Sequence, residues 1–298
     1  MYRLAVFLWL LCLGMQQCPA ADTDISVHDD AGKQVTLASP ARRVITLAPH
    51  LAEMVFAAGA GEFLVGTVEY SDYPPAAQSL PRVGDSFRID VESILNMRPD
   101  VVLVWGSGNP KVLREHLADL QLNVVVLEPR QLEDIAEHLR IIGAITGKRK
   151  EAAEAARSYL EDLDELRREY ADREKISVFY QISERPLYTI NGEHVISALL
   201  RMCGGRNIFA DLSALAPSVS TESVLQRNPE VILAGRFAKS NADPLIMWRR
   251  WSELAANKYD NFFSVTAETI ARSTPRVIKG GREICEALDQ ARSNIAQQ

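Results

Sequence analysis

Unbroken aliphatic runs alternate with helical stretches through the first half of the chain. Four of these runs read as strands buried on both faces, at Val44–Leu47, Phe63–Val68, Val101–Trp105 and Asn123–Leu127. A helix is predicted at Leu51–Ala58, and further helices fill the other gaps. Such alternation favours a mainly parallel sheet with right-handed crossovers. The first half of the chain therefore predicts an α/β lobe.

One long helical period follows, from Arg149 to Asp172. Its apolar residues recur on a single stripe, and charged residues occupy the other positions. At about 1.5 Å per residue such a helix reaches roughly 36 Å, enough to run along the back of two lobes as a stiff linker. A coiled coil is the alternative, but the stripe is shorter than the three or four heptads that a coiled coil needs.

A second α/β lobe is predicted after the linker helix. Its strands are expected at Ile176–Gln181 and Val231–Ala234, and its helices at Val195–Met202 and from Pro275 to about Ala291. One passage of the first lobe also recurs here. Residues 92–103 read ESILNMRPDVVL and residues 222–233 read ESVLQRNPEVIL, identical at six of twelve positions. The two copies predict two similar lobes, with a ligand cleft between them.

Each copy of the repeat begins with a glutamate, Glu92 or Glu222. Each is expected in the first turn of a helix, behind the capping residue Asp90 or Ser220. The helix dipole favours an acid there by about 0.3 to 1 kcal/mol, which alone would explain both glutamates. Two lobes related by a pseudo-twofold axis would instead place the carboxylates at opposite rims of one face. That arrangement would suit paired basic residues on a partner, so a docking role is the alternative to helix capping.

The N-terminus has the pattern of a secretory signal peptide. Arg3 precedes the apolar run LAVFLWLLCLG, and small residues around Ala20 offer a cleavage site. The run is too short for a membrane span of about 20 residues, so the mature chain is predicted to be soluble and periplasmic. The predicted organisation is a signal peptide at 1–20, an N-terminal lobe at 21–148, a linker helix at 149–172 and a C-terminal lobe at 173–298.

Export decides how the cysteines are interpreted. Cys12 and Cys18 leave with the signal peptide, and Cys203 and Cys285 remain as two thiols in an oxidising compartment. A disulfide between them is expected, which would close a loop of 82 residues. Two buried free thiols are the alternative.

Charge and motifs narrow the class of function. A formal net charge of −6 is unfavourable for an extended nucleic-acid surface. The sequence contains no G-x-S-x-G, Walker A, H-E-x-x-H or C-x-x-C motif. No catalytic residue and no metal site is therefore assigned, and the protein is predicted not to be an enzyme.

Candidate ligand contacts fall in loops that follow predicted strands. Loops at the carboxyl ends of parallel strands form the ligand crevice in doubly wound sheets. Aromatic residues at such positions would suit either a ligand or the core. His50, which opens a helix after the first strand, would ligate a metal carried in a ligand or be an ordinary helix-start residue. The predicted ligand-binding set is Tyr70, Trp105, Phe87, His50, Tyr188 and Glu268.

Six stretches spread over nearly the whole mature chain carry a family resemblance. They are RVITLAPHLAEMVFAAGAG from Arg43, EYSDYPP from Glu69, VESILNMRPDVVLVWGSGN from Val91, CGGRNIFAD from Cys203, VSTESVLQRNPEVI from Val219 and RSTPR ending at Arg276. Together they resemble the periplasmic cobalamin-binding proteins of cobalamin ABC importers, within the family of helical-backbone binding proteins.

The resemblance implies two Rossmann-like lobes bridged by one helix, a large flat ligand between them and little hinge motion. It implies that cobalamin, a corrinoid, is carried as cargo and not as a cofactor. It further implies that Glu92 and Glu222 dock onto arginines of an ABC permease dimer, that Cys203 and Cys285 are bonded, and that the aromatic cleft residues touch cobalamin.

The chain departs from the family pattern at two cleft positions. Ser86 and Ala216 stand where tryptophans line the cleft of the well-known cobalamin binder, although Phe87 lies next to the first. Haem and an iron siderophore are therefore alternative ligands. A periplasmic enzyme or metallochaperone on a chelatase-like scaffold is an alternative of another class, and it needs convergent titratable ligands. The candidates for these are His50, Glu69, Asp72 and Glu268.

Overall fold

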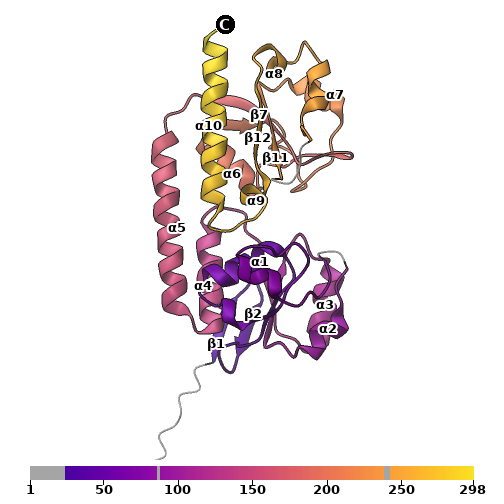
Figure 1. Cartoon of the computed structure of the whole chain (residues 1–298), viewed down its shortest axis with the longest axis vertical. Helices are drawn as coiled ribbons and strands as arrows, with labels where there is room; N and C mark the ends of the chain where they lie inside the picture. The colour runs from indigo at the N-terminus through magenta and orange to yellow at the C-terminus, as the bar shows by residue number, and fades with distance from the viewer. Residues whose placement is uncertain (1–23, 86–87, 238–241) are drawn as a thin grey trace, which may run out of the picture.

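Two parallel sheets form the centres of two lobes (Figure 1). The computed structural model describes residues 24–85, 88–237 and 242–298. The strand order of the first lobe is β4 (Leu64–Gly66), β3 (Val44–Thr46), β5 (Val101–Trp105) and β6 (Val124–Leu127). The order of the second is β10 (Gly205–Asn207), β7 (Ile176–Gln181), β11 (Val231–Arg236) and β12 (Phe262–Thr266). The predicted α/β class is confirmed.

The two sheets share one topology. In each, the order along the sheet is the second, first, third and fourth strand of that sheet in chain order. The repeated passage forms α2 (Val91–Asn96) with β5 in the first lobe and α7 (Thr221–Arg227) with β11 in the second. Both copies therefore occupy the third strand position, which confirms that the repeat marks two similar lobes.

Helix α5 (Arg149–Tyr170) joins the lobes and packs against one long helix of each. Its partners are α4 (Asp134–Thr146) and α10 (Val277–Ala296), and Figure 1 shows α5 running beside both. The predicted linker helix is present and ends two residues before Asp172. Its buried stripe belongs to one apolar core that continues into both lobes, through Ala152, Ala156, Tyr159, Leu163, Leu166 and Tyr170.

Shorter helices complete the two lobes. The α-helices are α1 (Pro49–Ala57), α3 (Lys111–Asp119), α6 (Val195–Met202), α8 (Ala255–Lys258) and α9 (Ala267–Ile270). The 3-10 turns are η1 (Gly61–Phe63), η2 (Pro75–Ser79) and η3 (Ile246–Arg250). Several predicted boundaries differ from the structure by one to five residues; for example, η1 delays the start of β4, α1 begins at Pro49, and α10 continues five residues beyond Ala291. Across the described ranges, no helix combines the length and apolarity that a membrane crossing requires.

Two hairpins were not predicted. The first pairs β1 (Ile25–His28) with β2 (Gln34–Leu37), and alternate side chains of both strands are buried in the core. The Asp29 carboxylate closes its turn by accepting from the amides of Ala31 at 3.0 Å and Lys33 at 2.8 Å. The second hairpin pairs β8 (Ser183–Glu184) with β9 (Leu187–Tyr188). Strands this short give too few alternations for a period of two to be recognised.

The predicted disulfide is present between Cys203 and Cys285. Cys203 is the C-cap residue directly after α6, Cys285 lies within α10, and neither side chain is exposed. The bond therefore ties two helices of the second lobe together across a sequence separation of 82 residues.

Replacement of one cysteine tests the contribution of this bond. Cys203→Ser is expected to lower the free energy of unfolding by about 4 to 5 kcal/mol in the loop-entropy model, because the unfolded chain loses its cross-link. Urea denaturation of both proteins measures the difference. Titration of thiols in the unfolded, unreduced wild type is the control. Two reactive thiols per mature chain would contradict the prediction.

Candidate ligand site between the lobes

Loops that follow strand ends in one lobe meet loops that follow strand ends in the other. Glu53 lies in α1 after β3, Asp72 follows β4, and each pairs with an arginine located between β12 and α10. Arg130 follows β6 and reaches toward Glu193, which precedes α6. The carboxyl edges of the two sheets therefore face each other. Doubly wound sheets bind ligands at this edge, so the loops between the lobes form the candidate site.

Glu53 forms a buried ion pair with the second lobe. Its side chain is 3% exposed and accepts from Arg276 Nε at 2.6 Å and Nη2 at 2.7 Å. Thr274 Oγ1 donates to the same carboxylate at 2.6 Å. The hydrogen bonds that Arg276 donates to Glu53 raise the pKa of Arg276. Because a bidentate pair has strict geometry, this contact sets how α1 lies against the start of α10.

Arg272 makes a second contact between the lobes. Its Nη1 lies 2.6 Å from Asp72 Oδ1, its Nη2 donates to the Tyr70 carbonyl at 2.9 Å, and Glu53 Oε2 is 3.9 Å away. Burial raises the pKa of Asp72, but the hydrogen bond and charge of Arg272 outweigh burial and hold this pKa below its ordinary value. Asp72 is therefore ionised at neutral pH and forms an ion pair with Arg272.

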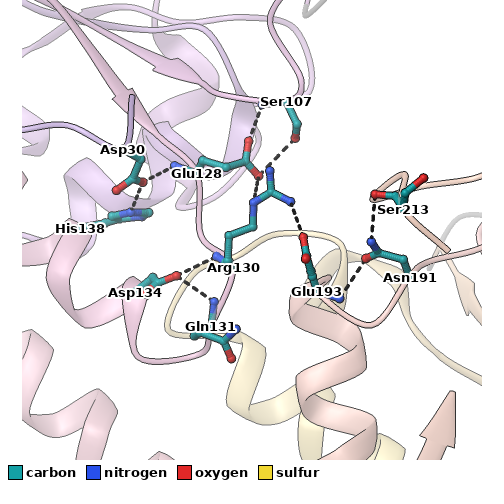
Figure 2. A network of polar contacts seen from close by, with 10 residues as sticks. All are labelled: Asp30, Ser107, Glu128, Arg130, Gln131, Asp134, His138, Asn191, Glu193 and Ser213. Carbon is teal, nitrogen blue, oxygen red and sulfur yellow. Dashed lines mark hydrogen bonds and ion pairs between the residues drawn. The ribbon is translucent and has the colours of Figure 1, made fainter. Parts of the chain in front are cut away.

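Arg130 belongs to a network that reaches the second lobe (Figure 2). Its guanidinium lies 3.8 Å from Glu128 in its own loop and 3.9 Å from Glu193 across the boundary. The Glu128 amide donates to Asp30 Oδ2 at 2.5 Å, and His138 Nε2 lies 2.7 Å from the same oxygen. The side chain that reaches across the boundary thus rests on a chain of polar contacts inside the first lobe.

The predicted aromatic contacts lie at the ends of strands. Tyr70 follows β4 and is 78% exposed, Trp105 ends β5 and is partly buried, and Tyr188 ends β9 and is 37% exposed. Phe87 lies outside the described residues. The exposed positions of Tyr70 and Tyr188 exclude a core role for these two side chains. Their contact with a ligand stays a prediction.

His50 is the second residue of α1 and is 7% exposed. Its ring meets Trp105 edge to face at 5.2 Å, and Nε2 has no hydrogen-bond partner among the residues that the structure describes. Burial lowers the pKa of His50 to about 3, so its imidazole is neutral at physiological pH. A neutral imidazole is the form that ligates metals, but this ring also packs as an ordinary helix-start residue would.

The other candidate carboxylates do not form a metal site with His50. Glu268 lies in the first turn of α9, directly after β12, and Glu69 is an exposed residue of the loop after β4. In the part of the chain that the structure describes, no group of three or more His, Cys, Asp or Glu side chains is placed to hold a metal ion.

Both glutamates of the repeat lie where the sequence predicted them. Glu92 follows the N-cap Asp90 of α2, Glu222 follows the N-cap Ser220 of α7, and both side chains are exposed. Hydrogen bonds from its own amide and from Ser220 lower the pKa of Glu222.

Sequence reasoning missed the charges that join the lobes. Arg272 and Arg276 were noted as part of a family pattern, but neither they nor Glu53 were given a role. One signal was available, because Glu53 is the single acid in the apolar stretch from Leu51 to Ala58. A charged side chain on a buried helix face requires a partner. The partner lies 223 residues away and has no local signature.

Comparison with models of protein families shows to which family the chain belongs. Residues 44–269 match the family described as periplasmic binding protein. This chain belongs to that family. The match runs from β3 to α9 and includes both sheets and α5. Membership in a family of binding proteins agrees with the prediction of a periplasmic protein that is not an enzyme.

Similar proteins share most of the chain. The vitamin B12-binding protein of Vibrio cholerae is 37% identical over 250 residues, which are 84% of this chain and 90% of the relative. That of Vibrio parahaemolyticus is 36% identical over 254 residues, 85% and 91% of the two chains. The crystal structure of the periplasmic vitamin B12-binding protein of Vibrio cholerae aligns with a TM-score of 0.79 at 36% identity, over 85% and 98% of the two chains. The predicted two-lobe fold is thereby confirmed.

The same fold occurs in a haem-binding protein. The periplasmic haem-binding protein RhuT of Roseiflexus sp. RS-1 aligns with a TM-score of 0.73 at 19% identity, over 84% of this chain and 99% of that one. At this identity the likeness concerns the fold alone. The fold by itself therefore does not choose between a corrinoid and haem.

Two histidines with lowered pKa values, His50 and His194, predict a loss of stability in mild acid. His50 and His194 have pKa values of about 3 and 4, below the ordinary 6.5, and burial is the main cause at both. The unfolded chain therefore binds protons below pH 6.5 that the fold does not. The free energy of unfolding keeps its full value above pH 6.5 and decreases as pH falls toward 3. At pH 5 the decrease due to His50 is about 2 kcal/mol.

Denaturation from pH 7 to pH 4 measures this slope. His50→Gln should flatten it, because glutamine does not titrate. His116→Gln changes an exposed histidine of α3 and is the matched control. Equal slopes in wild type and His50→Gln would show that His50 is not the source of the acid sensitivity.

Proposed function

We propose that this chain captures cobalamin in the periplasm and delivers it to an ABC importer. The observation that carries the proposal is the 37% identity to a vitamin B12-binding protein over 84% of this chain. The family match and the aromatic residues at facing strand ends support it. Residues 1–20 would act as the export signal, and they lie outside the described residues.

The candidate site has chemistry that suits a large flat ligand. Tyr70, Trp105 and Tyr188 lie at or after strand ends and keep aromatic surface at least partly exposed, and such surface would gain by covering the face or edge of a macrocycle. Buried apolar area contributes about 25 cal/mol per Å². His50 and Glu268 complete the proposed contact set, together with Phe87. One boundary between two lobes offers one such site per chain.

Limited movement between the lobes is part of the proposal. The core passes without interruption from one lobe through α5 to the other. Ion pairs from Glu53 and Asp72 then fix the lobes on the ligand side. A site held on two sides changes little on binding, so less ordering opposes capture of the ligand.

Glu92 and Glu222 are proposed to dock the loaded protein onto a permease dimer. Both are exposed first-turn acids at corresponding positions of two similar lobes. Two carboxylates so arranged match two arginines related by the twofold axis of a dimer, and such pairs steer the encounter and fix its register.

Calorimetric titration with cyanocobalamin, haem and a ferric siderophore tests the ligand. Cyanocobalamin is expected to bind at one site per chain and to be recovered chemically unchanged. Tight binding of haem or the siderophore without binding of cyanocobalamin would replace the corrinoid with that ligand. Conversion of the ligand would favour the enzyme or metallochaperone alternative.

The same titration places the site. Trp105→Ala should weaken cyanocobalamin binding by roughly 1 to 3 kcal/mol, because a large aromatic contact is lost. Trp251→Ala removes a partly exposed tryptophan beside Glu222 and is the matched control. Unchanged affinity in a destabilised Trp105→Ala protein would assign Trp105 to the core instead.

Docking and ligand binding should separate in a double variant. Glu92→Ala with Glu222→Ala is expected to leave cyanocobalamin affinity nearly unchanged and to abolish uptake through a reconstituted importer. The pair Glu154→Ala with Glu165→Ala removes the same charge from exposed positions of α5 and should transport normally. Normal uptake by the first pair, with a lowered melting temperature, would show that these acids serve only the helix ends.

A further inference from the structure

Tyr70 has a backbone conformation that its side chain disfavours. Its φ is +65°, in the left-handed region, which is unfavourable for a residue with a Cβ. Such strain persists only where the surroundings hold the residue, and it is frequent at ligand sites. The side chain gains little burial in return, because it is 78% exposed. Contacts other than burial of its side chain therefore hold Tyr70 in this conformation.

The first lobe holds the base of the Tyr70 loop, residues 68–73. A buried chain of hydroxyl groups runs from Thr46 of β3 to Thr67 and on to Ser71, with both oxygen separations at 2.8 Å. Arg82 Nη2 also donates to the Ser71 carbonyl at 3.1 Å. These contacts anchor the loop at Ser71. Within the loop, the Asp72 amide donates to the Tyr70 carbonyl at 3.0 Å.

The second lobe holds the tip of the loop. The Arg272 side chain is 14% exposed, and its two terminal nitrogens bind different groups of the loop. Nη1 pairs with Asp72 at 2.6 Å, and Nη2 donates to the Tyr70 carbonyl at 2.9 Å. The guanidinium thus binds the residues on both sides of Ser71, which are Tyr70 and Asp72. One of its hydrogen bonds is donated to the strained residue, Tyr70.

A neighbouring arginine holds the next tyrosine of the same loop. The Arg276 guanidinium carbon lies 3.8 Å from the centroid of the Tyr73 ring, while two of its nitrogens bind Glu53. Arg272 lies on the same stretch before α10 and is 3.9 Å from Glu53. The Tyr70 loop is therefore fixed from the opposite lobe by two arginines that share one buried carboxylate.

We propose that Arg272 is a positioning residue that holds Tyr70 in place for the ligand from across the interlobe boundary. The inference rests on the proposed function in so far as Tyr70 contacts the ligand. Arg272 itself need not touch it. A consequence is that the shape of the first lobe's ligand loop depends on the placement of the second lobe, so that ligand contact at Tyr70 and interlobe contact stabilise each other.

A double-mutant cycle between Arg272 and Tyr70 tests the coupling. Arg272→Gln and Tyr70→Ala are each expected to lower cyanocobalamin affinity about tenfold, roughly the effect of one charge-assisted hydrogen bond. The double variant should bind no more weakly than Tyr70→Ala alone, because Arg272 acts through Tyr70. Losses that multiply to about a hundredfold would show independent effects and overturn the proposal.

Two further variants separate positioning from charge. Arg272→Lys retains an attraction to Asp72 but lacks the fork that also reaches the Tyr70 carbonyl, so it should lose most of the affinity that Arg272→Gln loses. Arg249→Gln is the control, since Arg249 also pairs with an aspartate and lies over an aromatic ring, at Asp260 and Phe262. Wild-type affinity in Arg272→Lys would reduce Arg272 to a source of charge and overturn the proposal.

Hydrogen exchange without ligand gives a readout independent of the ligand's identity. The Asp72 amide donates to the Tyr70 carbonyl at 3.0 Å, so it reports the shape of the loop. Arg272→Gln should speed exchange at residues 70–72 while exchange in α5 stays unchanged. Unchanged exchange at the loop would overturn positioning by Arg272, whatever ligand binds. Failure of the wild type to bind cyanocobalamin, with faster loop exchange in Arg272→Gln, would reject the proposed ligand and retain the positioning role.

Discussion

The apolar stripe of α5 is the constraint on which the rest of the structure depends. Its buried side chains complete the core of the first lobe at one end and of the second lobe at the other. Separating the lobes would expose that stripe to water, at about 25 cal/mol for each Å² of apolar surface. The two lobes therefore keep one arrangement, in which the carboxyl edges of their sheets face each other.

The apolar core sets the approximate placement of the two lobes, and the polar contacts on the ligand side fix this placement more narrowly. Burial of apolar area has no preferred direction, whereas a bidentate pair such as Glu53 with Arg276 accepts one geometry. Buried ion pairs add little net stability, because desolvation opposes their attraction. Their role here is better explained as positioning. They fix the Tyr70 loop, which also carries Tyr73, relative to the opposite lobe.

The proposed function separates ligand binding at the interlobe boundary from docking at an outer rim. The proposed site at the boundary combines aromatic side chains at strand ends with the buried, neutral His50 of α1. The rim carries the exposed acids Glu92 and Glu222, one on each lobe. The repeated helix and strand unit places the same acid at corresponding positions of two similar lobes.

The sequence by itself determined the features that depend on local spacing. Periods of 3.6 residues and unbroken aliphatic runs predicted α5 and the central strands, the repeat predicted two lobes, and the compartment predicted the Cys203–Cys285 bond. Tertiary structure alone decided which distant charges meet. Glu53 pairs with Arg276 across 223 residues, and Arg272 holds Tyr70 across 202. Such pairings have no period or motif, because they follow from how two folded lobes are placed by α5.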